Sequence, residues 1–327
     1  MKRVTRHIAV LLLVLLTTAV KGQQLPIFSQ YVLNGFILNP AMAGFDGYTS
    51  VNTTARQQWL GFHDAPMTVS ASWQTRLLQR SYRIVGHPVR DKNMLLPSTK
   101  GRVGLGAYVI NDVNGNVART GIQFTYAYHI IMDYHQISFG LAGKMFQYRF
   151  SFDDLSFGLD WEPLAEQGMD NVGYIPDVDF GMYWTNRDYF IGASVNNLFQ
   201  SAVVLGGLSY EITVARHYWV MGAYKFRTGR DFEVEPNVLF KTTEQLIPQG
   251  DLGVKLYYME DYWAGLAFRT DGSLITLLGM RASGLFIGYA FDLSFNSIQR
   301  FNYGTHEVSI SYKFGNDARR YRWLRRY

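Results

Sequence analysis

One stretch near the end of the chain decides the fold most clearly: residues 305–314, THEVSISYKF. Its apolar side chains are Val308, Ile310, Tyr312 and Phe314, which occupy every second position. Polar side chains fill the positions between them. A period of two residues places the two kinds of side chain on opposite faces of a β-strand. The stretch therefore predicts a strand with one apolar face and one polar face.

The same alternation recurs along most of the chain, interrupted by turn-rich stretches. Each segment is about ten residues long, which suits a tilted strand that crosses a bilayer. We expect about 14 such strands, and an even number suits a closed antiparallel barrel. The predicted strands cover residues 48–59, 66–77, 101–112, 119–131, 135–150, 175–186, 188–198, 217–228, 231–242, 249–258, 261–270, 273–282, 284–293 and 305–314.

The connections between these strands alternate in length. If the first strand runs outward, the connections on the periplasmic side are mostly tight, whereas those on the other side are mostly longer. This asymmetry is typical of bacterial outer-membrane barrels. The stretch 78–100 departs from it, because it is long but falls on the periplasmic side. The long connections on the outer side cover residues 151–174, 199–216 and 294–304.

The composition separates a membrane barrel from a soluble β-protein. The chain is 48% apolar, 16% aromatic and 17% charged, with 31 glycines. A soluble β-sandwich, the main alternative, needs a dry core, and polar groups are costly there. Here the second face of each strand carries small or polar residues, which suits a wet lumen. We therefore expect an all-β, antiparallel transmembrane β-barrel over residues 48–314.

The N-terminus has the features of an export signal. Basic residues precede an apolar run at 8–16, and small residues lead to Gly22. This order predicts a signal peptide over residues 1–22, with an uncleaved anchor as the alternative. Residues 23–47 would then be a lead-in that plugs the lumen or packs beneath the barrel. The chain has no cysteine, which excludes disulfides and thiolate metal sites.

The C-terminus predicts a basic periplasmic tail over residues 315–327. Because the basic residues gather in the signal and the tail, the formal charge of +5 is not the broad basic surface of a nucleic-acid binder. Arginines interleaved with aromatic residues could dock an acidic periplasmic partner through bidentate contacts. The alternatives are a disordered tail and an interfacial anchor. The arginines are Arg319, Arg320, Arg322, Arg325 and Arg326.

Several motifs, in a fixed order, resemble the PorP/SprF family of the type IX secretion system. The opening motifs are FSQY at 28–31, LNPAMAG at 38–44, RQQWLG at 56–61 and APMT at 65–68. The closing motifs are GYAFD at 288–292 and GTHE at 304–307, followed by a strand that ends on an aromatic residue. The tail extends beyond that residue, which is a small departure from the pattern.

The resemblance implies an outer-membrane component of the secretion and gliding machinery of Bacteroidota. Such proteins are associated with the export or surface attachment of large adhesin-like partners that carry a C-terminal sorting domain. Periplasmic secretion subunits and outer-membrane lipid are further expected partners. The residues that we expect to shape the partner site are Asn39, Arg56, Gln57, Trp59, His306 and Glu307. The alternative role for the first four is to fix the register of the N-terminal segment against the first strands. For His306 and Glu307 the alternative is a polar contact at the external rim.

Candidate chemistry is sparse elsewhere. Acidic residues cluster in the stretch 151–174 and could bind Ca²⁺, although their spacing matches no EF-hand. Gly104 and Gly106 begin like a dinucleotide fingerprint but lie within a predicted strand, where they more simply relieve crowding. No hydrolase or zinc-protease motif occurs, so we expect no enzyme, cofactor or metal. The acidic cluster is Asp153, Asp154, Asp160 and Glu162.

Two functions of different classes follow. The first is a non-enzymatic secretion component that holds a protein partner. The second is a diffusion channel or a transporter of hydrophobic solutes, because a 14-stranded barrel with an N-terminal plug also resembles the long-chain fatty-acid transporters. A transporter needs a path for its solute, whereas a secretion component needs a stable protein partner.

Overall fold

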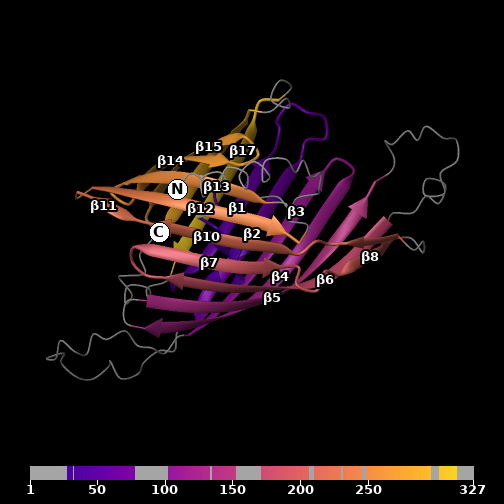
Figure 1. Cartoon of the computed structure of the whole chain (residues 1–327), viewed down its shortest axis with the longest axis horizontal. Coiled ribbons are helices and arrows are strands. Elements are labelled where there is room, and N and C mark those ends of the chain that lie inside the picture. Colours follow the sequence, from indigo (N-terminus) through magenta and orange to yellow (C-terminus); the bar gives the residue numbers. More distant parts are fainter. Residues whose placement is uncertain are drawn as a thin grey trace, which may run out of the picture.

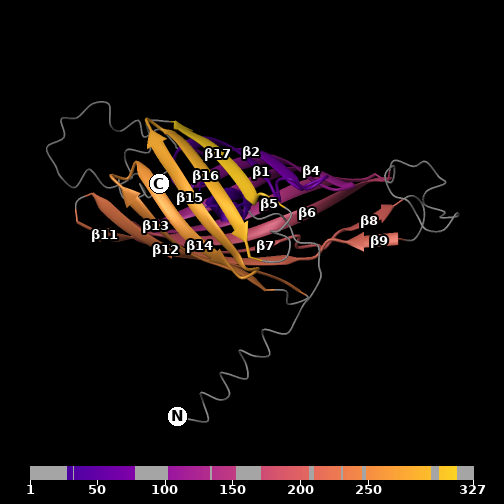
Figure 2. The same ribbon diagram turned by 90° about the horizontal axis from the view of Figure 1, so that it is seen from above.

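The computed structural model forms an antiparallel β-barrel, seen from the side in Figure 1 and from above in Figure 2. It describes residues 28–31, 33–77, 102–132, 135–151, 171–205, 210–229, 231–244, 248–295 and 302–314. The predicted signal peptide, the stretch 78–100, the acidic cluster and the arginine tail lie outside these residues. No helix among the described residues is long and apolar enough to cross a membrane.

Fourteen strands of the described part of the chain form the closed ring. Each pairs with its neighbours in sequence order, and β1 pairs with β17 to close the ring. The ring strands are β1 (Thr49–Gln57), β2 (Met67–Leu77), β3 (Val103–Asn114), β4 (Val117–Met132), β5 (His135–Phe150), β6 (Asn171–Thr185), β7 (Tyr189–Asn196), β10 (His217–Tyr224), β12 (Phe232–Thr243), β13 (Gln249–Tyr258), β14 (Tyr262–Arg269), β15 (Ser273–Ala282), β16 (Leu285–Ser294) and β17 (Thr305–Phe314).

The prediction of a barrel of about 14 strands is confirmed, with two corrections. The stretch 199–216, expected to be a loop, contains a small separate hairpin of β8 (Ala202–Leu205) and β9 (Tyr210–Thr213). The alternation pattern does not predict this hairpin, because each of its strands has only four residues, too few for a period of two to be recognised. The hairpin projects beyond the barrel beside β6 (Figure 2).

The second correction concerns the predicted strand 217–228, which is interrupted. β10 ends at Tyr224, and the short β11 (Phe226–Thr228) continues along β12. Pro236 of β12 lies opposite the interruption, between the last β10 pair at Asn237 and the first β11 pair at Val234. Proline has no N–H to donate to a ladder, so it interrupts the hydrogen bonds on one side of its strand.

The barrel wall buries polar side chains and exposes apolar ones, which is the reverse of the pattern in a soluble protein. Along β17, Glu307, Ser309 and Ser311 are buried, whereas Val308 and Ile310 are exposed. The other long strands repeat this pattern, with polar side chains inside and large apolar ones outside. An apolar outer band around a polar lumen is the arrangement of a membrane-spanning barrel.

The two ends of the barrel differ. Thr49 and Phe314 pair at one end, here called the terminal end, whose connections are tight except for the long one between β2 and β3. Two of these turns have two consecutive residues with positive φ, Met259–Glu260 and Ser283–Gly284. Positive φ at both central residues matches the type I′ turns that suit the twist of a hairpin. The other end, here called the loop end, carries β8–β9 and the connection at 58–66. Two connections there are also tight, since two residues join β3 to β4 and three join β14 to β15.

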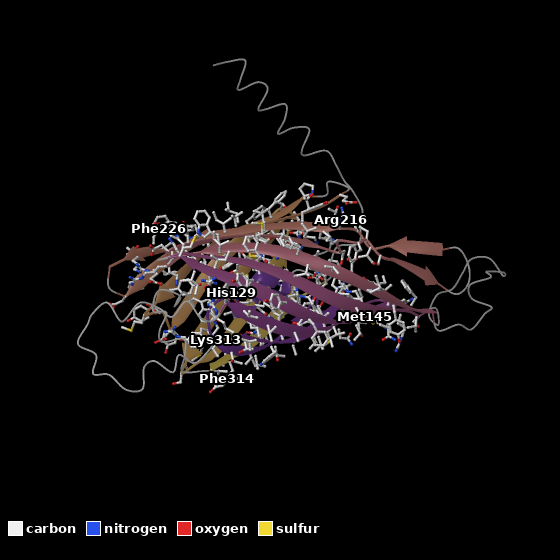
Figure 3. All side chains as sticks on the ribbon, turned by 90° about the horizontal axis from the view of Figure 1, so that it is seen from below. His129, Met145, Arg216, Phe226, Lys313 and Phe314 are labelled. Atoms are coloured by element: carbon white, nitrogen blue, oxygen red, sulfur yellow. The ribbon has the colours of Figure 1, made fainter. Side chains whose placement is uncertain are left out.

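Aromatic side chains gather on the outer wall near the terminal end. Tyr189 stacks on Tyr224, Tyr224 packs against Phe226, and Tyr312 stacks on Phe314. Phe226 and Phe314 lie toward this end in Figure 3, whereas Arg216 lies toward the loop end. Aromatic girdles of this kind lie at the bilayer interface of outer-membrane barrels.

Replacing Val254 by arginine should destabilise the barrel by about 2–4 kcal/mol, because Val254 lies on the outer face in the middle of β13, where lipid surrounds it. Urea unfolding in lipid vesicles measures the change, with Val254→Ala as the matched control. Equal stability of Val254→Arg and Val254→Ala would contradict a lipid-facing position.

Candidate functional site

The described part of the N-terminal segment lies among the inward-facing side chains of the barrel. Residues 28–31 and 33–47 are mostly buried, and they form two short 3-10 helices, η1 (Gly35–Ile37) and η2 (Pro40–Met42). Their hydrogen bonds reach strands on different sides of the ring, as the next paragraphs describe. So short a segment has no core of its own, and its conformation therefore depends on the barrel.

The first contact region is a buried charged cluster near the loop end. Arg269 of β14 donates two 2.8 Å bonds to the carboxylate of Asp251 on β13. Arg269 and Arg56 each lie 3.2 Å from Oδ2 of Asp292 on β16. Four neighbouring or near-neighbouring strands thus supply one network of two cations and two carboxylates. Buried charges of this kind are tolerated when each has a partner of opposite charge.

Glu307 of β17 joins this cluster to the N-terminal segment. Its side chain is 0% exposed, and its two carboxylate oxygens accept the backbone N–H groups of Ser29 and Gln30 at 2.7 and 2.8 Å. The hydroxyl of Ser29 donates to Asp292, with oxygens at 2.8 and 2.9 Å. Charge-assisted hydrogen bonds are among the stronger kinds in proteins. The motif at 28–31 is therefore held by residues of the closing motifs.

Asn39 makes the second contact region, on the other side of the lumen. Its amide donates to the carbonyl groups of Met182 on β6 and Ala193 on β7 at 2.9 and 3.2 Å. Its Oδ1 accepts the N–H of Ala41 and so caps η2, while Pro40 occupies the first position of that helix. Asparagine is among the preferred residues for such a cap, and proline suits the next position.

The third contact region fixes the end of the segment close to β1. His129 donates from Nε2 to the carbonyl of Ala43 at 3.0 Å, and its Nδ1 lies 2.7 Å from the hydroxyl of Ser138. Gln136 donates to the carbonyl of Phe45. His129 lies within the outline of the barrel in Figure 3. Near the terminal end, Lys313 of β17 pairs with Asp46 at 2.9 Å. These bonds tie residues 43–46 to strands β4, β5 and β17.

Glycines on the inner face make room for the segment. A Cβ atom at Gly140 of β5 would collide with the backbone of Pro40 and Ala41, and one at Gly104 of β3 would collide with the carbonyl of Ala43. A Cβ at Gly106 would meet the ring of Phe36. This agrees with the interpretation that Gly104 and Gly106 relieve crowding inside the barrel.

Two distant motifs meet at the loop end to form an ordered rim. Arg56 pairs in register with Glu307, and Gln57 with His306. Beyond the strands, the N–H of Trp59 donates to the hydroxyl of Thr305 at 3.2 Å, although Trp59 has a positive φ of 50°. A tryptophan in this conformation is uncommon and must be held by its surroundings.

The rim also presents apolar side chains to the outside. Leu60 exchanges backbone hydrogen bonds with Gly304 and Tyr303 at 2.9 and 2.7 Å, which joins the two connections. The side chains of Leu60, Phe62 and Tyr303 are exposed, and we call them the rim patch. His306 accepts at Nδ1 from the hydroxyl of Tyr289 at 2.7 Å and lies on the outer wall beneath the patch.

The predicted site residues therefore fall into two groups. Asn39 and Glu307 are buried and join the N-terminal segment to β6, β7 and β17. Arg56 is also buried and pairs with Asp292, which Ser29 of the segment contacts. Glu307 therefore faces the interior of the barrel and not the external rim. Gln57, Trp59 and His306 lie at the rim, where Gln57 donates to the carbonyl of Ala65. Sequence reasoning missed the contributions of Arg269, Asp251, His129 and Gln136, whose only signal was a polar residue on an inward-facing position.

Fold and site together define an outer-membrane β-barrel with an N-terminal segment among its lumen residues. Among the described residues, no group of three or more histidine or acidic side chains is placed to hold a metal ion. Residues 20–312 match the family described as type IX secretion system membrane protein PorP/SprF. The chain therefore belongs to the PorP/SprF family, and it is an outer-membrane component of type IX secretion. Membership implies interaction with secretion machinery and secreted cargo.

Solved structures resemble the chain in architecture. The toluene transporter TbuX of Ralstonia pickettii is 12% identical with a TM-score of 0.46, covering 86% of this chain and 93% of its own. Omp33 of Acinetobacter baumannii is 8% identical with a TM-score of 0.40, covering 82% and 99%. A FadL homologue of Pseudomonas aeruginosa is 8% identical with a TM-score of 0.40, covering 82% and 90%. No curated protein sequence matches the chain.

Gly140→Ala should lower the free energy of unfolding by about 1–3 kcal/mol, because the added methyl group collides with the backbone of the N-terminal segment. Gly143→Ala is the matched control on the same strand, since a Cβ there meets nothing within 4 Å. Its effect should stay within about 0.5 kcal/mol. Urea unfolding measures both variants. Equal losses of stability would contradict the role of Gly140 in making room for the N-terminal segment.

Glu307→Gln should speed amide hydrogen exchange at residues 28–31 by about tenfold or more, because glutamine has one acceptor oxygen where two N–H groups need one each. Exchange measured by mass spectrometry on the peptide that contains Ser29 and Gln30 tests this. His306→Gln changes the adjacent residue on the opposite face and should leave that exchange rate unchanged. Unaltered exchange in Glu307→Gln would show that Glu307 does not hold the segment.

Proposed function

We propose that the chain is a non-enzymatic barrel that binds a large adhesin-like partner through that partner's C-terminal sorting domain. In this role it supports export of the partner or its attachment at the cell surface, including attachment for gliding. The loop end faces outward, because tight turns in these barrels lie on the periplasmic side. The partner then meets the barrel at the rim patch.

The observation that carries this proposal is the ordered rim where the RQQWLG and GTHE motifs meet. Apolar side chains exposed on a hydrogen-bonded frame lose little conformational freedom when a partner covers them. Aromatic residues are also enriched among those that dominate binding energy at protein interfaces. Leu60, Phe62 and Tyr303 supply these contacts, while Gln57, Trp59 and His306 hold the frame.

The N-terminal segment has a supporting part in the proposal. Its hydrogen bonds reach β17, β6, β7 and β4, so the segment contacts strands on different sides of the lumen. A diffusion channel or hydrophobic-solute transporter would have to displace these bonds, including the charge-assisted ones at Glu307. The segment is better suited to act as a plug that also supports the wall beneath the rim.

The arginine tail would act on the opposite side of the membrane. If the loop end faces outward, residues 315–327 follow β17 into the periplasm. Arginine forms bidentate contacts with carboxylates, so an acidic periplasmic subunit of the secretion machinery is the partner that this composition fits.

Affinity purification of the tagged full chain from its native outer membrane, in mild detergent and with mass spectrometry, tests these roles. The unchanged chain should recover a large secreted protein with a C-terminal sorting domain. The double variant Leu60→Asp, Phe62→Asp should recover about tenfold less, because it places charge in an apolar contact. Met259→Asp, at an exposed turn of the terminal end, should recover as much as the unchanged chain.

Deletion of residues 315–327 should lose periplasmic secretion subunits and keep the secreted partner. Recovery of the barrel alone from the unchanged chain would contradict the proposal and favour the channel or transporter, which solute-uptake assays then measure. Equal recovery by the rim variant and the Met259→Asp control would place the partner elsewhere.

A further inference from the structure

A hollow of about 400 Å³ lies on the outer face of the barrel wall, on strands β7, β10, β12 and β13. These strands are consecutive in the ring (Figure 1). The volume of the hollow is within the range of about 300–1,000 Å³ that is usual for ligand sites. Ile191, Val238 and Leu252 border it, and each is 45% or more exposed, so the hollow opens toward lipid. The other outward-facing side chains that border it are Tyr189, Tyr224 and Pro236.

Two small residues on neighbouring strands create this hollow. Ile191, Gly222 and Val238 are register partners across the wall, so the glycine leaves a gap between two branched side chains. Two residues from Val238 toward the terminal end, Pro236 presents only its ring. A Cβ atom at Gly222 would meet no atom closer than 3.4 Å, the carbonyl oxygen of Phe190. The wall would therefore accept a side chain at this position, and its own packing does not require the gap.

Aromatic residues of the bilayer interface border the hollow on the side of the terminal end. Tyr189 and Tyr224 are register partners, and their rings stack with centroids 6.4 Å apart. Phe226, labelled in Figure 3, packs against Tyr224. Tyrosines of this kind mark the level of the lipid head groups. The hollow therefore begins at the interface and extends toward the middle of the hydrocarbon region.

A charged cluster lies beyond these tyrosines, at the terminal end. Arg227 of β11 lies 3.0 Å from Asp188 and 3.4 Å from Glu233. Those pairs engage Nη2 and Nε, and the side chain of Arg227 is 40% exposed, so the N–H groups of Nη1 stand outside them. Arg187, in the turn before β7, is exposed as well. Arginine suits phosphate, and the carboxylates suit the ammonium group of a zwitterionic head group.

Shape and charge together decide which molecule fits. Lipid tails are as apolar as the wall, so an apolar surface alone does not hold one chain in place. A hollow surrounds a chain on several sides and adds dispersion contacts, each small but many in number. The arginines add charge-assisted hydrogen bonds to a phosphate. A transmembrane helix or a second barrel could match the apolar wall, but a phospholipid matches both the wall and the charged cluster.

We propose that this hollow binds one acyl chain of a phospholipid, whose phosphate accepts hydrogen bonds from Arg187 and Arg227. The bound chain fills the gap over Gly222 and covers the wall at Pro236, where the ladder beside β12 is interrupted. The choice of leaflet rests on the orientation given under the proposed function, which makes this a lipid of the periplasmic leaflet. Binding itself does not depend on that orientation.

The first test is titration of the full chain in detergent with palmitoyl-oleoyl phosphatidylethanolamine, followed by native mass spectrometry. The unchanged chain should retain one lipid. Gly222→Leu should bind it at least about tenfold more weakly, because the new side chain occupies the hollow. Gly143→Leu is the matched control, since Gly143 faces outward on β5, a Cβ there meets nothing within 4 Å, and it does not line the hollow. Equal affinities of the two variants would overturn the proposal.

The second test concerns the phosphate. Palmitoyl-oleoyl glycerol has the same chains without a phosphate, and the unchanged chain should bind it about tenfold more weakly than the phospholipid. The double variant Arg187→Gln, Arg227→Gln should lose this preference. Arg281→Gln should keep it, because Arg281 pairs with Asp261 at another turn of the terminal end. Equal affinity of the unchanged chain for both lipids would overturn recognition of the phosphate.

Purification from the native membrane separates a lipid from a protein occupant. Gly222→Leu should recover the same proteins as the unchanged chain. Loss of a membrane protein in Gly222→Leu, with phospholipid binding intact, would assign the hollow to a protein and overturn the proposal. Because the titrations use the purified chain, failure of lipid binding leaves the partner role of the rim patch untouched.

Surface labelling tests the leaflet separately. The chain has no cysteine, so Met259→Cys provides a single thiol at an exposed turn of the terminal end. A membrane-impermeant maleimide should not label this variant on intact cells. Labelling would place the terminal end outside, and it would overturn both the periplasmic leaflet and the outward-facing rim.

Discussion

The structure depends on the hydrogen-bonded ladder between β1 and β17. No water is available in the hydrocarbon region to satisfy an open strand edge, so the first and last strands must pair. This ladder runs from Thr49 with Phe314 to Gln57 with His306. The register that closes the ring also places Arg56 beside Glu307. Closure thereby brings together two motifs that stand at opposite ends of the sequence.

The charged lumen follows from the same constraint. With the outer wall given mainly to apolar residues, most polar side chains of the strands face inward, where they need partners. Arg269, Asp251, Asp292 and Arg56 supply one another with partners across neighbouring strands. Glu307 instead receives two backbone N–H groups from the N-terminal segment. The segment is therefore part of the electrostatic balance of the lumen as well as a filler of space.

Alternation was sufficient to predict the strands because each strand has two chemically different faces along most of its length. Thr305–Phe314 was predicted with the bounds that the structure has. The β8–β9 hairpin escaped prediction because four-residue strands are too short for a period to appear, and Pro236 alone signalled the interruption opposite Tyr224.

The residues of the candidate site could be predicted only in part. Motifs marked Asn39, Arg56 and Glu307, but nothing local pairs Arg269 with Asp251 or Ser29 with Asp292. Those distances are set by the stagger of the closed ring and by the path of the N-terminal segment through it. Such relations are properties of the whole barrel, and a pattern read along one strand does not contain them.

The bond between Ser29 and Glu307 joins residues 278 positions apart, and this separation bears on the order of assembly. The segment is synthesised first and the strand that holds it last. Because β17 both closes the ring and contacts the segment, the segment must already lie among the other strands when the ring closes, or be threaded in afterwards through a narrow, charged interior. Closing around it is the shorter route. The N-terminal segment would then act as an internal template. Pairing of β17 with β1 would close the ring and form the bonds of Glu307 to the segment in the same step.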